Sequence, residues 1–283
     1  MNIFETIKEG LRIARTSKSL WLFGFFVGVG AIGNSGNKSY VPGVPPAVHV
    51  PAHAMTGGAA LLAIAILLLI AAGVFMYFVS EGALIEGVTR LRRAKLPTLR
   101  EGWHDGLAHW GVLLRIAVIY VAMSVASLAV LGAPIALALK LSGTPLAVMV
   151  AIPAVLILVP WLATLYMWQA FAARIAVIEN RRARDAIAKA RLFLHGRLML
   201  GLKLIVAAII GRLIVLIAGA AGLALAALIA VGVLKGLGLA QATVPVIALG
   251  ALALLPLTFI LVAISGTTQS SIWTIGYLTQ EQK

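Results

Sequence analysis

Apolar residues fill six long stretches of this chain, and polar residues gather in the segments between them. Several stretches reach about 20 residues, enough at about 1.5 Å per residue for a helix to cross a hydrocarbon core of about 30 Å. Apolar and polar residues do not alternate with the period of two that a membrane barrel needs, so the pattern predicts helices. We expect six spans, the first of them short, near residues 20–32, 59–78, 111–139, 146–178, 198–233 and 244–275.

A short amphipathic segment precedes every second span. Residues 98–110 show it most clearly, because Thr98 and Glu101 have the spacing of a capping box at a helix start. The apolar positions that follow form one helical stripe, Leu99, Trp103, Leu107 and Trp110. Similar segments cover residues 2–17 and 180–197. We expect these three amphipathic helices to lie in the headgroup layer of a membrane.

The composition excludes an ordinary soluble domain. Hydrophobic residues make up 61% of the chain and charged residues 11%, whereas soluble domains carry about 25% charged residues. There is no cysteine, so disulfides and thiolate metal sites are excluded. The net charge of +14 does not indicate nucleic-acid binding, because the basic residues cluster in every second connection between spans. By the positive-inside rule this predicts an inner-membrane protein with cytoplasmic N- and C-termini.

The basic segments also predict where lipids bind. Each Lys or Arg near an anionic membrane surface contributes about 1 kcal/mol of attraction. We therefore expect anionic headgroups to contact two basic runs on the cytoplasmic side. These comprise Arg90, Arg92, Arg93, Lys95, Arg181, Arg182 and Arg184.

The order of segments suggests one integral membrane domain over residues 1–283, built as a threefold repeat of an amphipathic helix plus a helical hairpin. The units are 2–95, 96–179 and 180–278. The alternative is that any six-span protein with basic inner connections would show such helix-start signals. Residues 34–58 contain four prolines and predict an extended outer loop. Gly24 and Gly28 form a GxxxG pair suited to close helix contact.

Arg212 is the charge that we place well inside a span, about nine residues beyond Lys203. An arginine in that position indicates a functional site by default, and Glu81 at the inner end of the second span is its expected partner. The alternatives are that Arg212 extends to the headgroups or neutralises Glu81 as a packing pair. Gln169 and Gln269 could line a polar path with them, although such residues more often hold helices together.

No arrangement of residues indicates catalysis. The chain has neither a Walker-type phosphate loop nor a GxSxG nucleophile motif. His49 and His53 lie four residues apart, but Pro51 disfavours a helix between them and no third ligand is near. We therefore expect no catalytic residues, metal or cofactor.

Three segments carry a family resemblance. Ser19-Leu-Trp-Leu-Phe-Gly-Phe25, after a basic helix, resembles uncharacterised bacterial multi-pass proteins. Residues 82–99 and 171–197 are similar to the membrane domain associated with glycerophosphodiester phosphodiesterases. The resemblance implies a six-helix membrane module that occurs with or without a catalytic barrel. Nothing here matches the barrel or its acidic and histidine metal site, so phosphodiesterase activity is not carried over.

These observations lead to a functional hypothesis. We expect a non-enzymatic scaffold that associates with membrane lipids, with room for a protein partner in the membrane. The chief alternative is a transporter or channel for a small solute or lipid, with a polar path around Arg212 and Glu81. An intramembrane enzyme ranks third.

Overall fold

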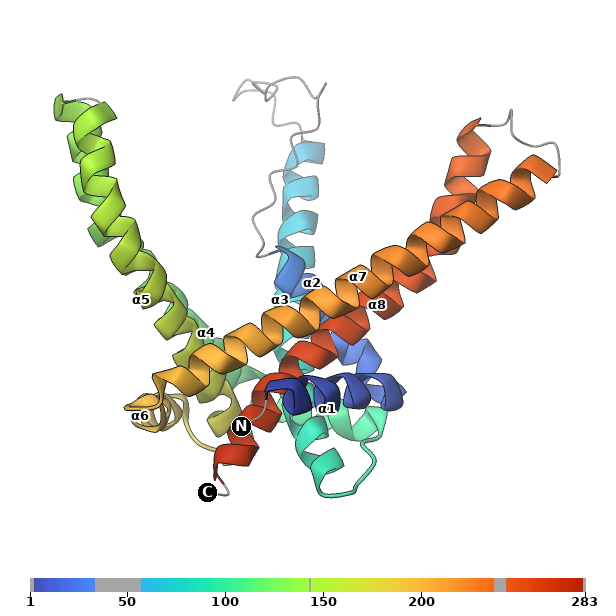
Figure 1. The fold of residues 1–283 in the computed structure, drawn as a ribbon, viewed down its shortest axis with the longest axis horizontal. Helices are drawn as coiled ribbons and strands as arrows, with labels where there is room; N and C mark the ends of the chain where they lie inside the picture. Colours follow the sequence, from blue (N-terminus) through green and yellow to red (C-terminus); the bar gives the residue numbers. More distant parts are fainter. Residues whose placement is uncertain (1–2, 34–56, 143, 237–242, 282–283) are drawn as a thin grey trace.

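The computed structural model describes residues 3–33, 57–142, 144–236 and 243–281. Within these residues the secondary structure is entirely helical (Figure 1), which confirms the all-α prediction. The elements are α1 (Ile3–Thr16), the short 3-10 helix η1 (Lys18–Leu20), α2 (Trp21–Gly33), α3 (Gly57–Arg92), α4 (Leu99–Ser142), α5 (Thr144–Ile178), α6 (Ala183–Leu194), α7 (Leu198–Gly236) and α8 (Thr243–Glu281).

Five helices, α3, α4, α5, α7 and α8, are long and apolar enough to cross a membrane. The apolar helix α2 has 13 residues and is about 20 Å long, shorter than a hydrocarbon core of about 30 Å. The predicted loop at 34–58, with His49 and His53, falls outside the described residues except for Gly57 and Gly58, which already belong to α3. Five spans are thus supported, and the sixth stays a prediction.

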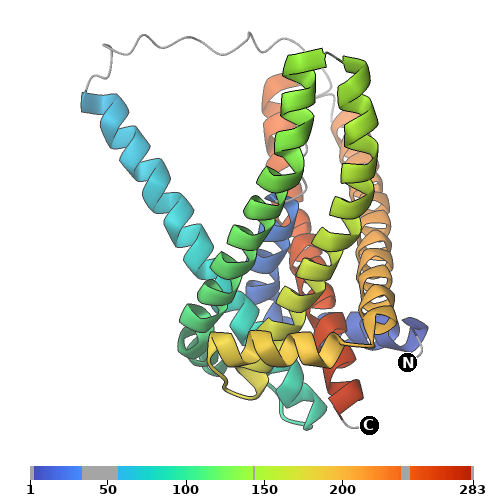
Figure 2. The ribbon, with the colours of Figure 1, turned by 90° about the vertical axis from the view of Figure 1, so that its left-hand side faces the viewer.

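Two of the three predicted amphipathic helices are separate elements. α1 and α6 are short and lie across the lower ends of the long helices (Figures 1 and 2). The apolar stripes read from the sequence are the faces that they bury: Ile7 and Ala14 in α1, and Ile187 and Leu194 in α6. Burial of these faces holds each short helix on the protein.

The expected amphipathic helix at 98–110 is not separate, which corrects the sequence-based prediction. It forms the first turns of α4, which continues without a break for 44 residues. Gly111 is the only weak helix former at the expected boundary, and the first proline in the helix is Pro134. The change from amphipathic to apolar sequence therefore marks a change of surroundings and not the end of a helix.

The capping box at the start of α4 is present. The Thr98 backbone N–H donates to Glu101 Oε2 at 3.1 Å, and the Glu101 N–H donates to Thr98 Oγ1 at 3.3 Å. From this start α4 extends about 66 Å, about twice the hydrocarbon thickness. The beginning of α4 and the end of α3 consequently form a hairpin that continues past the membrane-spanning region.

The pairing of helices agrees only in part with a threefold repeat. α4 runs beside α5, and α7 beside α8 (Figures 1 and 2). α2, however, packs more extensively on α8 than on its expected partner α3. The first unit differs from the other two, so the repeat remains a prediction.

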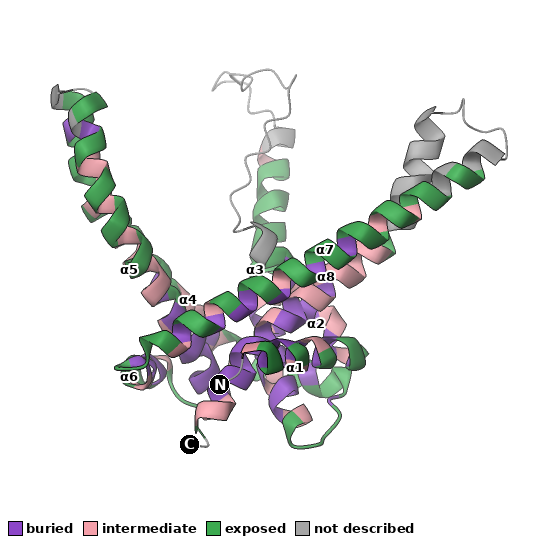
Figure 3. Ribbon diagram, viewed as in Figure 1, coloured by how far each residue is buried: buried purple, intermediate pink, exposed green. Residues whose placement is uncertain are grey.

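Buried residues concentrate at one end of the molecule, which we call the compact end, where α1 and α6 lie (Figure 3). The long helices spread apart from there, and their side chains become exposed. Leu69 of α3 is 75% exposed and Leu156 of α5 is 69% exposed. Apolar exposure of this extent fits helices whose surroundings are lipid.

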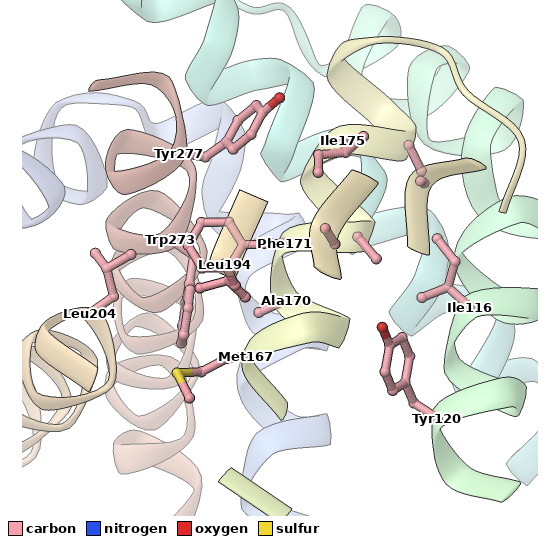
Figure 4. Close-up of a cluster of buried hydrophobic side chains, with 14 of the residues drawn as sticks. Ile116, Tyr120, Met167, Ala170, Phe171, Ile175, Leu194, Leu204, Trp273 and Tyr277 are labelled. Carbon is pink, nitrogen blue, oxygen red and sulfur yellow. The ribbon is translucent and has the colours of Figure 1, made fainter. Parts of the chain in front are cut away.

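The largest hydrophobic cluster joins α1, α4, α5, α6, α7 and α8 at the compact end (Figure 4). Trp273 and Tyr277 of α8 pack against Phe171 of α5, and the Phe171 and Trp273 rings meet edge to face at 5.7 Å between centroids. Leu194 of α6, Leu204 of α7 and Ile116 of α4 belong to the same cluster. α5 and α8 are thereby joined at the end from which they spread apart.

The backbones of α2 and α8 touch. A Cβ atom on Gly24 would overlap the carbonyl oxygen of Ala263, and a Cβ on Gly266 would overlap that of Gly24. Gly28 faces the backbone of Val262 in the same way. The predicted close contact at Gly24 and Gly28 is therefore confirmed, with α8 as the partner helix.

Glu179 connects three elements at the compact end. It follows α5, and its carboxylate accepts hydrogen bonds from Lys189 Nζ of α6 at 2.6 Å, Arg181 Nε at 2.7 Å and the hydroxyl of Tyr277 in α8. Burial raises the pKa of Glu179, but the hydrogen bonds from Lys189, Tyr277 and Arg181 outweigh it and hold the pKa below its usual value. The ionised form is thus the one that the fold favours.

The α2–α8 contact leads to a first prediction. Gly24→Ala should lower the stability of the protein by about 1–3 kcal/mol, because the added methyl group meets backbone that cannot move aside. Gly73→Ala in α3 is the matched control, since a Cβ there has nothing within 4 Å. Thermal unfolding of the detergent-solubilised protein measures both. Equal stability of the two variants would contradict the close contact.

Glu179 leads to a second prediction. Because its pKa is lower in the folded protein, the stability it contributes is complete above the unfolded pKa of about 4.5 and is lost as the pH falls further. Glu179→Gln should therefore reduce the fall in thermal midpoint between about pH 5 and pH 3. Glu5→Gln, at an exposed carboxylate of α1, is the control. An unchanged pH profile in Glu179→Gln would show that these hydrogen bonds do not stabilise the fold.

Candidate functional site

A polar cavity of about 80 Å³ lies inside the compact end, between α3, α4, α5 and α8. Val27 of α2 and apolar residues of α3, α4 and α5 form part of its wall. The rest of the wall is polar or amphipathic, which is uncommon among the membrane-spanning segments of a protein. These lining residues are Tyr77, Glu81, Tyr166, Gln169, Arg174, Gln269, Ser270 and Trp273.

An ion pair between α3 and α5 borders the cavity. Arg174 Nη1 lies 3.5 Å from Glu81 Oε1 and also donates a hydrogen bond to the Ala170 carbonyl oxygen at 2.8 Å. The two charged side chains are 5% and 16% exposed, respectively. Burial of either charge without the other would destabilise the protein, so each charge requires its partner.

The packing of α5 explains why Arg174 is buried. All eight residues from 170 to 177 are buried, because α3, α4, α6 and α8 surround the end of this helix. On α3, Glu81 follows three consecutive buried residues, 78–80. Both side chains consequently point into the packed end of the molecule.

Several polar atoms of the cavity wall have no hydrogen-bond partner within the described part of the chain. They are Nε of Arg174, Oγ of Ser270 and Nε1 of Trp273, from residues that are 4%, 2% and 1% exposed. Buried polar groups in native proteins nearly always bond to something, and an unpaired one costs about 1–3 kcal/mol. Three such groups around one cavity indicate a site for a polar group.

Residues of α5 and α8 line one side of the cavity. Gln269 Nε2 donates to the Tyr166 hydroxyl at 3.3 Å, and this bond bridges the two helices. Tyr166 lines the cavity and is also 44% exposed, so this residue separates the cavity from the surface of the protein. Beyond it α5 and α8 diverge (Figure 1). The cavity therefore lies next to the point from which α5 and α8 spread apart.

Three of the four polar residues singled out from the sequence, Glu81, Gln169 and Gln269, line this cavity. Arg212 does not. It lines a groove of about 240 Å³ formed by α2, α7 and α8, together with Thr258 and Ser265. A sequence pattern could not show that Glu81, Gln169 and Gln269 share one cavity, because they belong to three different helices.

The expected pair of Arg212 with Glu81 is wrong. Glu81 pairs with Arg174, and Arg212 lines a different cavity from Glu81. Arg212 was also not the only cation inside an expected span, since Arg174 lies within 146–178 and Arg115 within 111–139. The presence of Arg174 four residues before the end of α5 was the sequence signal that was missed.

The basic residues expected to contact anionic lipids fall into two groups. Arg90, Arg92 and Arg181 are in ion pairs: Arg90 Nη2 lies 2.7 Å from Asp105, Arg92 Nη2 lies 3.3 Å from Glu9, and Arg181 Nε bonds to Glu179. Because Arg90 also approaches Glu86 and Glu101, its ion pairs tie the end of α3 to the start of α4. The charge of these three arginines is offset within the protein.

The second group is exposed and makes no ion pair among the described residues. It comprises Arg93, Lys95, Arg182 and Arg184. Their charge is directed at the surroundings, so they are better placed than the first group to meet lipid phosphate. Within the described residues no three His, Asp or Glu side chains are grouped so as to hold a metal ion.

The buried ion pair leads to a third prediction. Glu81→Gln or Arg174→Met alone should destabilise the protein by about 3–5 kcal/mol, because each leaves a buried charge without its partner. The double variant should lose less stability than the sum of the two, since it removes both charges. A double-mutant cycle on thermal unfolding in detergent measures the coupling. Additive losses would mean that the pair does not interact.

Comparisons of the chain with protein-family models, curated proteins and solved structures find no match. The resemblance to the membrane domain associated with glycerophosphodiester phosphodiesterases stays a prediction from residues 82–99 and 171–197. The function must accordingly be inferred from the cavity and its surroundings.

Proposed function

We propose that the chain is a non-enzymatic lipid-binding scaffold of a bacterial inner membrane, with its compact end toward the cytoplasm. Five helices of membrane-spanning length support the membrane location. Exposed basic residues at the compact end, such as Arg93 and Arg182, support this orientation through the positive-inside rule. The cavity at Glu81 and Arg174 is the proposed binding site for a lipid headgroup.

The observation that carries this proposal is the set of unpartnered polar atoms beside a buried ion pair. Arg174 Nε and Trp273 Nε1 can donate to a phosphate oxygen, and the Ser270 hydroxyl can donate or accept. The Glu81 carboxylate can accept further hydrogen bonds from an ammonium group, since it has about four acceptor positions. Together these groups complement a zwitterionic headgroup such as phosphoethanolamine.

The size of the cavity sets how such a lipid would bind. About 80 Å³ holds a group the size of a phosphate or an ammonium, because a single water needs about 10–15 Å³ measured in this way. The remainder of the headgroup would lie toward exposed Tyr166. The acyl chains would extend between the diverging α5 and α8, along apolar side chains such as Ile157 and Leu255, which are 61% and 60% exposed.

The alternative of a transporter or channel receives less support. A polar path through both Arg212 and Glu81 would need the two residues in one cavity, whereas they line separate ones. Transport of a lipid through the cavity is compatible with the same binding chemistry. Binding of a headgroup is the step that both functions would share, so it is the step to test first.

The fourth prediction concerns the lipid that accompanies the protein. Purified in nanodiscs prepared from native membrane and then analysed by native mass spectrometry, the protein should retain phosphatidylethanolamine through moderate activation. Glu81→Gln combined with Arg174→Met should reduce the retained lipid at least fivefold, because the double variant removes the groups that bind phosphate and ammonium.

Arg212→Gln is the matched control, because it removes a charge from the separate groove and should leave retention within twofold of the native protein. Circular dichroism and the thermal midpoint verify that the double variant is folded. Equal retention of phosphatidylethanolamine by the folded double variant and the native protein would contradict the proposal. Retention of an acidic lipid in its place would also contradict the zwitterionic assignment.

A further inference from the structure

A second cavity lies at the surface, lined by residues of α4 and of the start of α6. Its volume is about 720 Å³, and none of its lining residues belongs to the cavity at Glu81 and Arg174. Three arginines line it, Arg115 from α4 and Arg182 and Arg184 from α6 and its N-cap position. Asp185 is the only carboxylate among its lining residues.

The three arginines are not neutralised by the protein. All three are exposed, and within the described part of the chain none makes an ion pair with a carboxylate. The adjacent Arg181 shows the contrast, because it bonds to Glu179 at 2.7 Å. With Asp185 counted, the cavity therefore carries a surplus of two positive charges, which would attract an anion.

The backbone of α6 adds to this positive field. Its first helical hydrogen bond runs from the Ala186 N–H to the Arg182 carbonyl, so the N–H groups before residue 186 have no acceptor within the helix. Arg182 at the N-cap position makes no capping bond through its side chain. The positive end of the helix dipole thus points toward the same cavity as the arginines.

The position of Arg115 distinguishes a lipid from a soluble anion. It lies about 24 Å along α4 from Leu99, in a stretch whose next exposed residues, Val118 and Ile119, are apolar. Val118 is 58% exposed and lines the same cavity. Arginines and exposed apolar side chains of α4 accordingly line the same cavity, which matches a molecule with a phosphate head and a hydrocarbon tail.

We propose that this cavity binds the phosphate group of an anionic phospholipid such as phosphatidylglycerol, with Arg115, Arg182 and Arg184 as its ligands. Arginine suits this role because its planar guanidinium donates two parallel hydrogen bonds to phosphate oxygens. The site is independent of the zwitterionic site, since the two have no residue in common. Either proposal can therefore fail while the other holds.

The test measures retention of phosphatidylglycerol by protein in nanodiscs of 30% phosphatidylglycerol and 70% phosphatidylcholine, using native mass spectrometry. A triple variant with Arg115→Gln, Arg182→Gln and Arg184→Gln should retain at least tenfold less phosphatidylglycerol than the native protein. Asp185→Asn should retain more, because it removes the one carboxylate of the cavity.

The matched control is a triple variant with Arg93→Gln, Lys95→Gln and Arg100→Gln. It removes the same number of exposed cations, none of which lines the cavity, and should reduce retention less than threefold. Equal losses in the two triple variants would mean that surface charge alone attracts the lipid, and would overturn the proposed site.

A second arm identifies the source of the phosphate. Inorganic phosphate at 10 mM should leave phosphatidylglycerol bound if the apolar lining residues of the cavity contribute to binding. Full displacement of phosphatidylglycerol from the native protein by inorganic phosphate would assign the site to a soluble phosphate and overturn the lipid assignment. The Glu81→Gln and Arg174→Met double variant should behave as the native protein in both arms.

Discussion

The contact between the backbones of α2 and α8 is the constraint on which the compact end depends. Glycines on both helices let them approach until backbone touches backbone, at Gly24 and Gly266. In that position α8 also contacts α1, α3, α5 and α7. It contributes Gln269, Ser270 and Trp273 to the polar cavity, so the spacing of α2 and α8 determines where one wall of that cavity stands. A larger residue in the contact would displace that wall.

The arginines of this chain illustrate how environment decides the role of a charge. Arg174 is buried and must have Glu81 beside it, whereas Arg90 is offset by three carboxylates, two of which belong to the neighbouring helix α4. Arg115 and Arg184 are exposed and have no carboxylate partner among the described residues. The first two stabilise the structure, and the last two are available to ligands. A count of basic residues in a segment would not separate these roles.

The sequence was sufficient for the features that depend on local pattern. Apolar runs located the long helices, amphipathic stripes located α1 and α6, and the spacing of Thr98 and Glu101 located the start of α4. Features that depend on neighbours were missed. Arg174 is buried because four other helices surround the end of α5, and a pattern along one helix carries no record of that. The continuity of α4 was missed because a change in polarity resembles a boundary in the sequence.

The hairpin formed by the end of α3 and the start of α4 has a mechanical consequence. Ion pairs from Arg90 to Glu101 and Asp105 brace its two arms, and neither helix is interrupted on the way to the cavity, which receives Glu81 from one arm and Leu113 from the other. The ion pairs thus fasten the two arms together at a distance from the cavity, because Arg90, Glu101 and Asp105 are not among its lining residues. Loss of Arg90 would free the tip of the hairpin while leaving every side chain of the cavity wall in the sequence.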